Sequence, residues 1–348
     1  MKRLISGLVK RSDTKRDRFR DRIVVVTGGS AGLGRATAIA FAKAGAQIAI
    51  LARDNERLRD AQEEIESYGV KCLPLSVDVA DADAVDQAAS LVESELGPIE
   101  VWVNNAMTTI FAPIDQIEPA EFKRATEVTY LGVVYGTMAA LKRMRHRDRG
   151  TIVQVGSALA YRSIPLQSAY CGAKHAIRGF TDSLRAELIH ERSRLRLTMV
   201  QMPALNTPQF DWCLSRMPRK SQPVPPIFQP EVGAQAILWA IEHRRRELYV
   251  GWPSLKTIIG NKLFPALGDR LAASEAWDGQ MTSEAQTGGA AANLFAPVAG
   301  IERAHGRFDA RALARSRELG LRESLGWLIP LSLTAIVAGF ALRAVLSA

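Results

Sequence analysis

Cysteine is scarce in this chain of 348 residues. Its three cysteines, Cys72, Cys171 and Cys213, are an odd number with no close spacing, so they predict neither a disulfide framework nor a zinc site. A reducing compartment is therefore expected. The five histidines are scattered, which favours surface or packing roles, and we predict no bound metal. No secretory signal is visible, because the apolar run after Lys2 and Arg3 is far too short.

Positive charge is concentrated at the N-terminus. The formal net charge is +9, and residues 1–22 hold nine Lys or Arg against three Asp, which places +6 there and leaves +3 elsewhere. So small an excess over the rest of the chain argues against a nucleic-acid-binding surface. The basic arm, residues 1–20, either contacts anionic lipid or is a solvated tail.

Internal repeats are also absent, and strand and helix patterns instead alternate over residues 21–251. Strands are expected at 23–26, 47–51, 72–77, 101–103, 151–155, 196–201 and 247–250. Helices are expected after the first strand and at about 54–68, 81–96, 119–147, 170–192 and 232–242. This alternation predicts an α/β fold of the Rossmann type, a doubly wound seven-stranded parallel sheet with helices on both faces. Ligands of such sheets bind at the carboxyl ends of the strands.

A glycine-rich turn, TGGSAGLG at residues 27–34, joins the first strand to an alanine-rich helix. Glycines let the backbone approach a pyrophosphate, and a helix N-terminus offers free N–H groups and a partial positive charge. A glycine-rich string alone is weak evidence. The flanking strand and helix make a nucleotide-binding turn the favoured interpretation.

The segment SALAYRSIPLQSAYCGAK contains a serine, a tyrosine and a lysine whose spacing suits a proton-transfer site. Tyr170 and Lys174 are four residues apart and so share one helix face. The ammonium is expected to lower the pKa of Tyr170 towards working pH. A phenol with a lowered pKa can pass a proton to or from an alcohol or carbonyl oxygen. Ser157, at a strand end, is placed to hydrogen-bond that oxygen. The alternative is an ordinary surface tyrosine and lysine, which Y-x-x-x-K by itself does not exclude.

Together with Asp78-Val79 and the NNA string that begins at Asn104, these motifs resemble those of the classical short-chain dehydrogenase/reductase family. The resemblance covers about Asp21–Gly251. It implies an NAD(P)-dependent oxidoreductase that moves hydride between C4 of the nicotinamide and an alcohol or carbonyl carbon. It also implies a homodimer or homotetramer, because members commonly pair through two long helices.

The resemblance assigns roles to individual residues. Tyr170 looks like the general acid/base, Lys174 would lower its pKa and bind the nicotinamide ribose, and Ser157 would orient the substrate oxygen. The residues implied in cofactor binding, beyond Tyr170 and Lys174 themselves, are Thr27, Gly28, Ser30, Gly32, Leu33 and Gly34 at the pyrophosphate, Asp78 and Val79 at the adenine, Asn104 and Ala106 at the adenosine ribose, and Pro203 and Thr207 at the nicotinamide.

Three positions depart from the family pattern. Met107 replaces the glycine of NNAG, and Ala204 replaces the glycine usual after Pro203. Thr129 stands where an asparagine commonly helps to hold a water of the proton relay. A threonine has no amide, so we expect a different or slower relay.

Cofactor choice is argued from charge. The second strand ends at Ala52, followed by Arg53, where a carboxylate would favour NAD(H). A guanidinium instead suits the 2′-phosphate of NADP(H). We therefore expect NADP(H) to be preferred, with NAD(H) possible. The alternative is that Arg53 pairs with Asp54 or Glu56.

The segment 205–229 includes Phe210, Trp212 and Met217, and its family counterpart covers the substrate. An apolar cover indicates a lipophilic small-molecule substrate, or these residues simply pack. In the extension 252–323, residues 252–271 are apolar with scattered charges. We expect them to pack on the body of the protein, to lie on a membrane surface or to contact a partner. Residues 280–300 are interpreted as a linker.

The longest uncharged run of the chain is nineteen residues at 324–342, and it is strongly apolar. As a helix it would span about 28 Å, close to the hydrocarbon core of a bilayer. Six arginines at 303–322 would stay on the cytoplasmic side. We predict a C-terminal single-pass membrane anchor. The alternative is a hydrophobic tail helix docked on protein, in a soluble cytoplasmic enzyme.

The predicted function is a membrane-anchored, NADP(H)-dependent oxidoreductase acting on a lipophilic secondary alcohol or ketone. A second hypothesis, motivated by Met107 and Thr129, is a catalytically weak NAD(P)-binding sensor or scaffold with the same fold.

Overall fold

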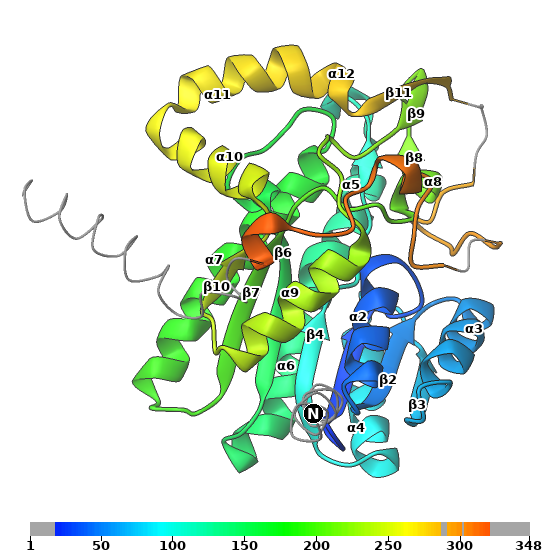
Figure 1. Cartoon of the computed structure of the whole chain (residues 1–348), viewed down its shortest axis with the longest axis vertical. Coiled ribbons are helices and arrows are strands. Elements are labelled where there is room, and N and C mark those ends of the chain that lie inside the picture. The colour runs from blue at the N-terminus through cyan, green and yellow to red at the C-terminus, as the bar shows by residue number, and fades with distance from the viewer. Residues whose placement is uncertain (1–17, 287–290, 301–302, 321–348) are drawn as a thin grey trace, which may run out of the picture.

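The computed structural model describes residues 18–286, 291–300 and 303–320. Its centre is a seven-stranded sheet in the order β10-β7-β6-β4-β1-β2-β3, with every neighbouring pair parallel (Figure 1). The strands are β1 (Ile23–Thr27), β2 (Gln47–Ala52), β3 (Cys72–Ser76), β4 (Ile99–Asn104), β6 (Thr151–Ser157), β7 (Arg196–Met202) and β10 (Glu247–Tyr249). All seven predicted strands are confirmed, with boundaries within a few residues.

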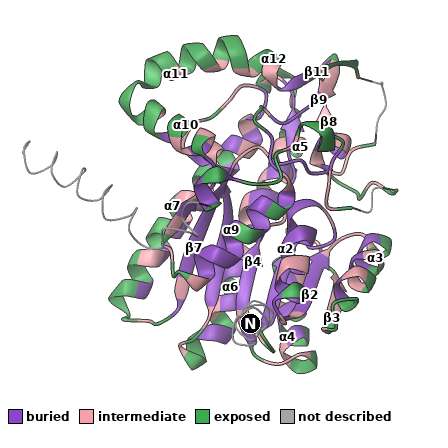
Figure 2. Cartoon of the chain, in the orientation of Figure 1, coloured by how far each residue is buried: buried purple, intermediate pink, exposed green. Residues whose placement is uncertain are grey.

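The inner strands are mostly buried because helices cover both faces of the sheet. In β1, IVVVT, all five residues are buried. One face is covered by α2 (Gly32–Lys43), α3 (Asn55–Glu66) and α9 (Pro230–Glu242). The other is covered by α4 (Ala82–Glu95), α6 (Gly132–Met144) and α7 (Ser168–His190). Figure 2 shows the resulting buried layer running through the middle of the molecule.

The strand order reverses at the centre of the sheet. The chain leaves β1 towards β2 and β3 on one side, and then crosses to β4 on the other side of β1. The loops that follow β1 and β4 therefore diverge at the carboxyl end of the sheet and leave a crevice between them. The glycine turn, Asn104 and Ser157 all lie at this edge.

The predicted helix at 119–147 is not continuous. It is divided into α5 (Pro119–Thr126), a wider π-helical turn (Glu127–Leu131) and α6, followed by a 3₁₀ turn (Arg145–Arg147). The π turn contains Thr129, whose hydroxyl donates to the Thr108 carbonyl at 2.9 Å and accepts from the Thr108 N–H at 3.0 Å. A π turn inside a helix often marks a functional region.

The C-terminal extension folds back over the crevice. α10 (Trp252–Leu263) and α11 (Pro265–Leu271), yellow in Figure 1, form an arm beyond the sheet, followed by a π turn (Ala272–Ala276) and α12 (Trp277–Gly279). The expected linker contains a strand, β11 (Met281–Ala285), which pairs antiparallel with β9 (Arg219–Ser221). The pattern misses this strand because its residues are mostly polar and it pairs at the surface.

The remaining short elements are β5 (Ile110–Phe111), which pairs with β8 (Leu214–Ser215), the helix α8 (Gln209–Trp212), and 3₁₀ turns at Ile114–Gln116, Ala158–Ala160 and Asp309–Arg311. Within the described residues, no helix combines the length and apolar character needed to cross a membrane. The predicted tail helix, 324–342, lies outside the described residues.

Candidate active site

The turn between β1 and α2 is built so that only glycine fits at its key positions. Gly28 has a φ of +66° and Gly32 a φ of +56°, the left-handed region that side chains disfavour. A Cβ added at Gly28 would lie 2.9 Å from Ala106 Cα, and one at Gly34 would lie 2.0 Å from the Gly28 carbonyl oxygen. The backbone is therefore open at the start of α2, as a dinucleotide's pyrophosphate requires.

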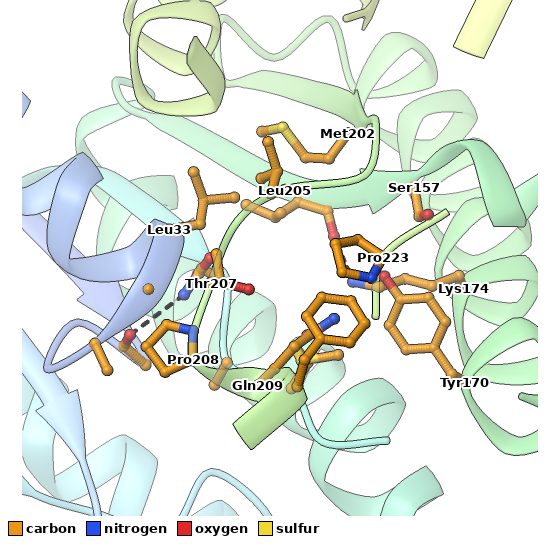
Figure 3. Close-up of a pocket in the computed structure, with 18 of the residues that line it drawn as sticks. Leu33, Ser157, Tyr170, Lys174, Met202, Leu205, Thr207, Pro208, Gln209 and Pro223 are labelled. Carbon is orange, nitrogen blue, oxygen red and sulfur yellow. Dashed lines mark hydrogen bonds between the residues drawn. The ribbon is translucent and has the colours of Figure 1, made fainter. Parts of the chain in front are cut away.

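A cavity of about 410 Å³ runs from this turn to the start of α7. It brings together most of the predicted site residues, which are Gly28, Ser30, Gly32, Leu33, Arg53, Asp78, Val79, Ala106, Ser157, Tyr170, Lys174, Pro203 and Thr207. In Figure 3, Ser157, Tyr170 and Lys174 lie on one side of it, and Leu33, Thr207 and Pro208 on the other. Met107 and Ala204, two of the departures from the family pattern, also line it.

Three predicted cofactor residues do not line the cavity, and Asn104 differs most from expectation. Its side chain is buried, donates to Thr137 Oγ1 at 3.0 Å and Gln154 Oε1 at 2.9 Å, and accepts from Trp102 Nε1 at 2.8 Å. These bonds use the amide inside the sheet, and the next residue, Asn105, faces the cavity instead.

Thr27 and Gly34 do not line the cavity and instead hold the backbone of the turn in place. Thr27 Oγ1 accepts from the N–H groups of Asn105 and Ala106, at 2.9 and 3.1 Å, and so ties the β1 loop to the β4 loop. Gly34 is required by its close contact with the Gly28 backbone.

Ser157, Tyr170 and Lys174 converge from two elements. Ser157 ends β6, and its hydroxyl contacts the Tyr170 phenol and accepts from the Leu159 N–H at 3.1 Å. Lys174, one turn after Tyr170 on α7, is only 2% exposed and donates to the Val155 carbonyl at 2.7 Å. Its Nζ lies 5.4 Å from the centre of the Tyr170 ring. The i, i+4 spacing thus places Lys174 beside the Tyr170 ring, and the Tyr170 phenol contacts the Ser157 hydroxyl.

The pKa of Tyr170 moves opposite to the prediction. Burial raises it to about 12, and the hydrogen bond with Ser157 opposes this only in part. Burial also lowers the pKa of Lys174 to about 8. Desolvation disfavours the charged form of each group. The protein by itself therefore presents Tyr170 as a protonated phenol, which can donate its proton.

Thr129 does not reach Lys174 in the way expected of the asparagine it replaces. Its single hydroxyl donates to and accepts from the backbone of Thr108 and is fully buried. The ammonium of Lys174 is held by the Val155 carbonyl instead.

Arg53 lines the cavity at its far end, but its partner is neither Asp54 nor Glu56. Asp54 caps α3 and pairs with Arg57 at 2.9 Å. The Arg53 guanidinium instead donates to the carbonyls of Leu294 at 3.4 Å and Phe295 at 2.9 Å, and also to that of Asn293. Sequence reasoning missed these contacts because 240 residues separate the partners.

Asp78 also lines this end of the cavity. Although burial acts to raise its pKa, hydrogen bonds from the Ala80 N–H and from Arg124 lower it below the ordinary value. The carboxylate is therefore ionised at neutral pH and already paired with Arg124. Arg57 and Arg124 complete a group of cationic residues whose buried roles had no sequence signal, since both occur in ordinary charged helices.

Residues 22–212 match the short chain dehydrogenase family, which is more than half of the chain. The chain is a short-chain dehydrogenase. Over 261 residues this dehydrogenase is 33% identical to an uncharacterized oxidoreductase, YxnA, of Bacillus subtilis (strain 168), covering 74% of this chain and 73% of that protein. It is 35% identical over 192 residues to 3-dehydrosphinganine reductase of Danio rerio, covering 54% of this chain and 57% of the reductase.

The match with the reductase thus spans little more than half of either protein. Among solved structures, the dehydrogenase resembles an alcohol dehydrogenase from the archaeon Thermococcus sibiricus complexed with 5-hydroxy-NADP. The TM-score is 0.58 at 26% identity, over 66% of this chain and 95% of that chain. The family match and these relatives together identify this protein as an oxidoreductase.

The cover of the dehydrogenase's cavity is held by residues that follow the matched region. Arg307 donates to the Phe210 carbonyl at 3.2 Å and pairs with Asp211 at 2.6 Å. Asn206 donates to Asp309 at 2.8 Å. The C-terminal extension therefore fixes the segment expected to cover the substrate.

Proposed function

We propose that this dehydrogenase uses NADP(H) to interconvert a lipophilic secondary alcohol and the corresponding ketone. The observation that carries the proposal is the shared cavity. Ser157, Tyr170 and Lys174 lie at one end, and the glycine turn and Arg53 lie at the other. The spacing suits an extended dinucleotide with its reactive end at Tyr170 and its phosphates at the turn.

When bound, the nicotinamide would supply or accept the hydride. The protein's own part is to hold and protonate oxygen. The Ser157 hydroxyl orients the substrate oxygen, and Tyr170 Oη donates its proton to that oxygen as the carbonyl is reduced. Because burial raises the pKa of Tyr170 to about 12, the phenol is protonated at neutral pH, which suits reduction more than alcohol oxidation.

The residues that would hold the cofactor follow from the lining. The N–H groups at the start of α2 and Ser30 would take the pyrophosphate, and Asp78 and Val79 would take the adenine. Lys174 would contact the nicotinamide ribose. Pro203 and Thr207 would lie at the nicotinamide. Thr27, Gly34 and Asn104 would act only through the shape of the turn and sheet.

The substrate side supports an apolar ligand. Apolar side chains of the cover, among them Leu205, Phe210, Trp212 and Val224, line the cavity. Relatives of this dehydrogenase include 3-dehydrosphinganine reductases, so long-chain ketones such as 3-dehydrosphinganine are the first candidates. The test is NADPH consumption with this ketone and a series of shorter ketones. A rate that rises with chain length is expected, and no turnover across the series would contradict the proposal.

The second candidate function, a catalytically weak NAD(P)-binding sensor or scaffold, is favoured by one observation. The Thr129 hydroxyl is used by the Thr108 backbone and leaves the usual relay without its side chain. Cofactor binding measured by calorimetry, without turnover in the ketone series, would support this alternative.

Replacing Arg53 with alanine is expected to weaken NADPH binding by about 30-fold and to change NADH binding little. The 2′-phosphate would lose charge-assisted hydrogen bonds, which contribute about 1.5–3 kcal/mol. Calorimetric titration of both cofactors measures the difference. Arg59→Ala is the matched control, since Arg59 is an exposed arginine on α3. Equal losses for NADPH and NADH would contradict the assigned preference.

We also propose that the enzyme works on the cytoplasmic side of a membrane, anchored by residues 324–342. The arm carries exposed apolar side chains, including Leu263, Phe264 and Leu267, which suit a membrane surface. Pro253 and Thr257, a few residues earlier in the same arm, line the cavity. The full chain should stay in the membrane pellet after a carbonate wash, and its release would contradict the anchor. The homodimer or homotetramer stays a prediction, to be checked by light scattering.

A further inference from the structure

The far end of the cavity is closed by a short stretch of the extension, residues 291–297, which we call the strap. Asn293 and Pro297 of the strap line the cavity beside Arg53. The strap gives Arg53 three carbonyl acceptors, those of Asn293, Leu294 and Phe295. The Leu294 carbonyl also accepts from Arg124 Nε at 3.2 Å.

The strap is itself firmly anchored. Leu294 is 1% exposed and packs in an apolar cluster with Ile110 and Ala125. The Asn293 N–H donates to the Trp212 carbonyl at 2.9 Å. With its oxygen turned towards the indole, the Asn293 side chain also accepts from Trp212 Nε1 at 2.9 Å. The carbonyls that hold Arg53 are thus fixed before any ligand arrives.

The charged side chains around the strap have one positive charge more than they have negative charges. Arg57 pairs with Asp54, and Arg124 pairs with Asp78. Among the described residues, Arg53 has no carboxylate within ion-pairing distance and is held only by neutral carbonyls. Three guanidinium groups face two carboxylates, so the group keeps an excess charge of one.

The hydrogen bonds of Arg53 also leave donors free. A guanidinium has five N–H groups, and the strap carbonyls accept two hydrogen bonds from Nη1 and one from Nη2. Nε and one N–H of Nη2 have no acceptor among the described residues. Free donors on a planar guanidinium suit a phosphate, which can accept more than one hydrogen bond from the same group.

We propose that the strap is a positioning element for cofactor choice, which holds the Arg53 guanidinium in place so that its free donors can bind the 2′-phosphate. The inference rests on the NADP(H) preference proposed above. It adds that the selectivity depends on residues 293–295, which lie some 240 positions from Arg53 in sequence. Without the strap, the long arginine side chain would have to be ordered on binding, and part of the selectivity would be lost.

The test compares two fragments that differ only in the critical phosphate, adenosine 2′,5′-bisphosphate and adenosine 5′-monophosphate, titrated by calorimetry into the full chain. Asn293→Ala and Leu294→Ala should each weaken the bisphosphate by about tenfold and leave the monophosphate unchanged. Unchanged monophosphate binding also shows that the variant is folded. Leu313→Ala, at an exposed leucine of the same extension, is the control and should change neither.

Four results would overturn the inference. If both fragments weaken equally in the two strap variants, the strap is only structural. If the bisphosphate binds more tightly, the carbonyls compete with the phosphate. When the unmodified chain itself does not distinguish the fragments, the proposed NADP(H) preference fails as well. When it does distinguish them but the strap variants behave like the control, the inference alone fails.

Discussion

Replacing Tyr170 with phenylalanine is expected to lower kcat/KM for ketone reduction by about 10³-fold, the scale of a lost general acid. The change removes only the hydroxyl that would donate the proton and keeps the ring that lines the cavity. Binding of NADPH, followed by calorimetry, should change far less than turnover. The measurement is the initial rate of NADPH consumption at ketone concentrations well below KM.

Tyr161→Phe provides the matched control. The Tyr161 hydroxyl is also partly buried, but it donates to Glu247 Oε1 at 2.6 Å and does not line the cavity. Its loss should reduce stability and leave turnover nearly intact. If Tyr170→Phe keeps a rate comparable to that of this control, the acid assigned to the reaction is wrong.

Replacing Lys174 with methionine is expected to reduce turnover by about 10²-fold or more and, at pH 7, to stabilise the fold. Burial lowers the pKa of Lys174 from 10.5 to about 8, which corresponds to about 3 kcal/mol of destabilisation while the amine is charged. Methionine keeps most of the buried alkyl chain without the charge. It loses the hydrogen bond to the Val155 carbonyl, a loss of about 1.5–3 kcal/mol. The net gain at pH 7 is then about 1 kcal/mol.

The gain should disappear at high pH. Between about pH 8 and pH 10.5, the unfolded chain binds a proton at Lys174 that the folded chain has released. Stability of the unmodified protein therefore rises with pH across this window. The methionine variant lacks this contribution and should become the less stable protein near pH 10.5. Other groups that titrate there are common to both proteins and cancel in the difference.

Urea denaturation of both proteins at pH 7 and pH 10.5 measures the effect. A variant that is less stable at pH 7 by the same amount as at pH 10.5 would mean that burial of the ammonium carries no such penalty. Turnover provides the second readout, since a merely structural lysine would change stability alone.

Local sequence patterns are enough to predict the framework of this dehydrogenase. Runs such as IVVVT in β1 predict fully buried strands, and the glycines of TGGSAGLG indicate a turn that side chains would block. The four-residue spacing of Tyr170 and Lys174 places both on one face of α7. Each of these inferences depends on local geometry, because strand periodicity, helix periodicity and backbone sterics act over only a few residues.

The surroundings of these groups, in contrast, depend on how the whole chain folds. The side chain of Asn104 is used inside the sheet, the hydroxyl of Thr129 is taken by Thr108, and Arg53 is held by carbonyls from the strap. The direction in which the Tyr170 pKa shifts also depends on the folded structure, because it is set by how far burial removes the phenol from water. Hydrogen-bond partners and desolvation are set by segments that are distant in sequence and adjacent only after folding, and no local pattern encodes them.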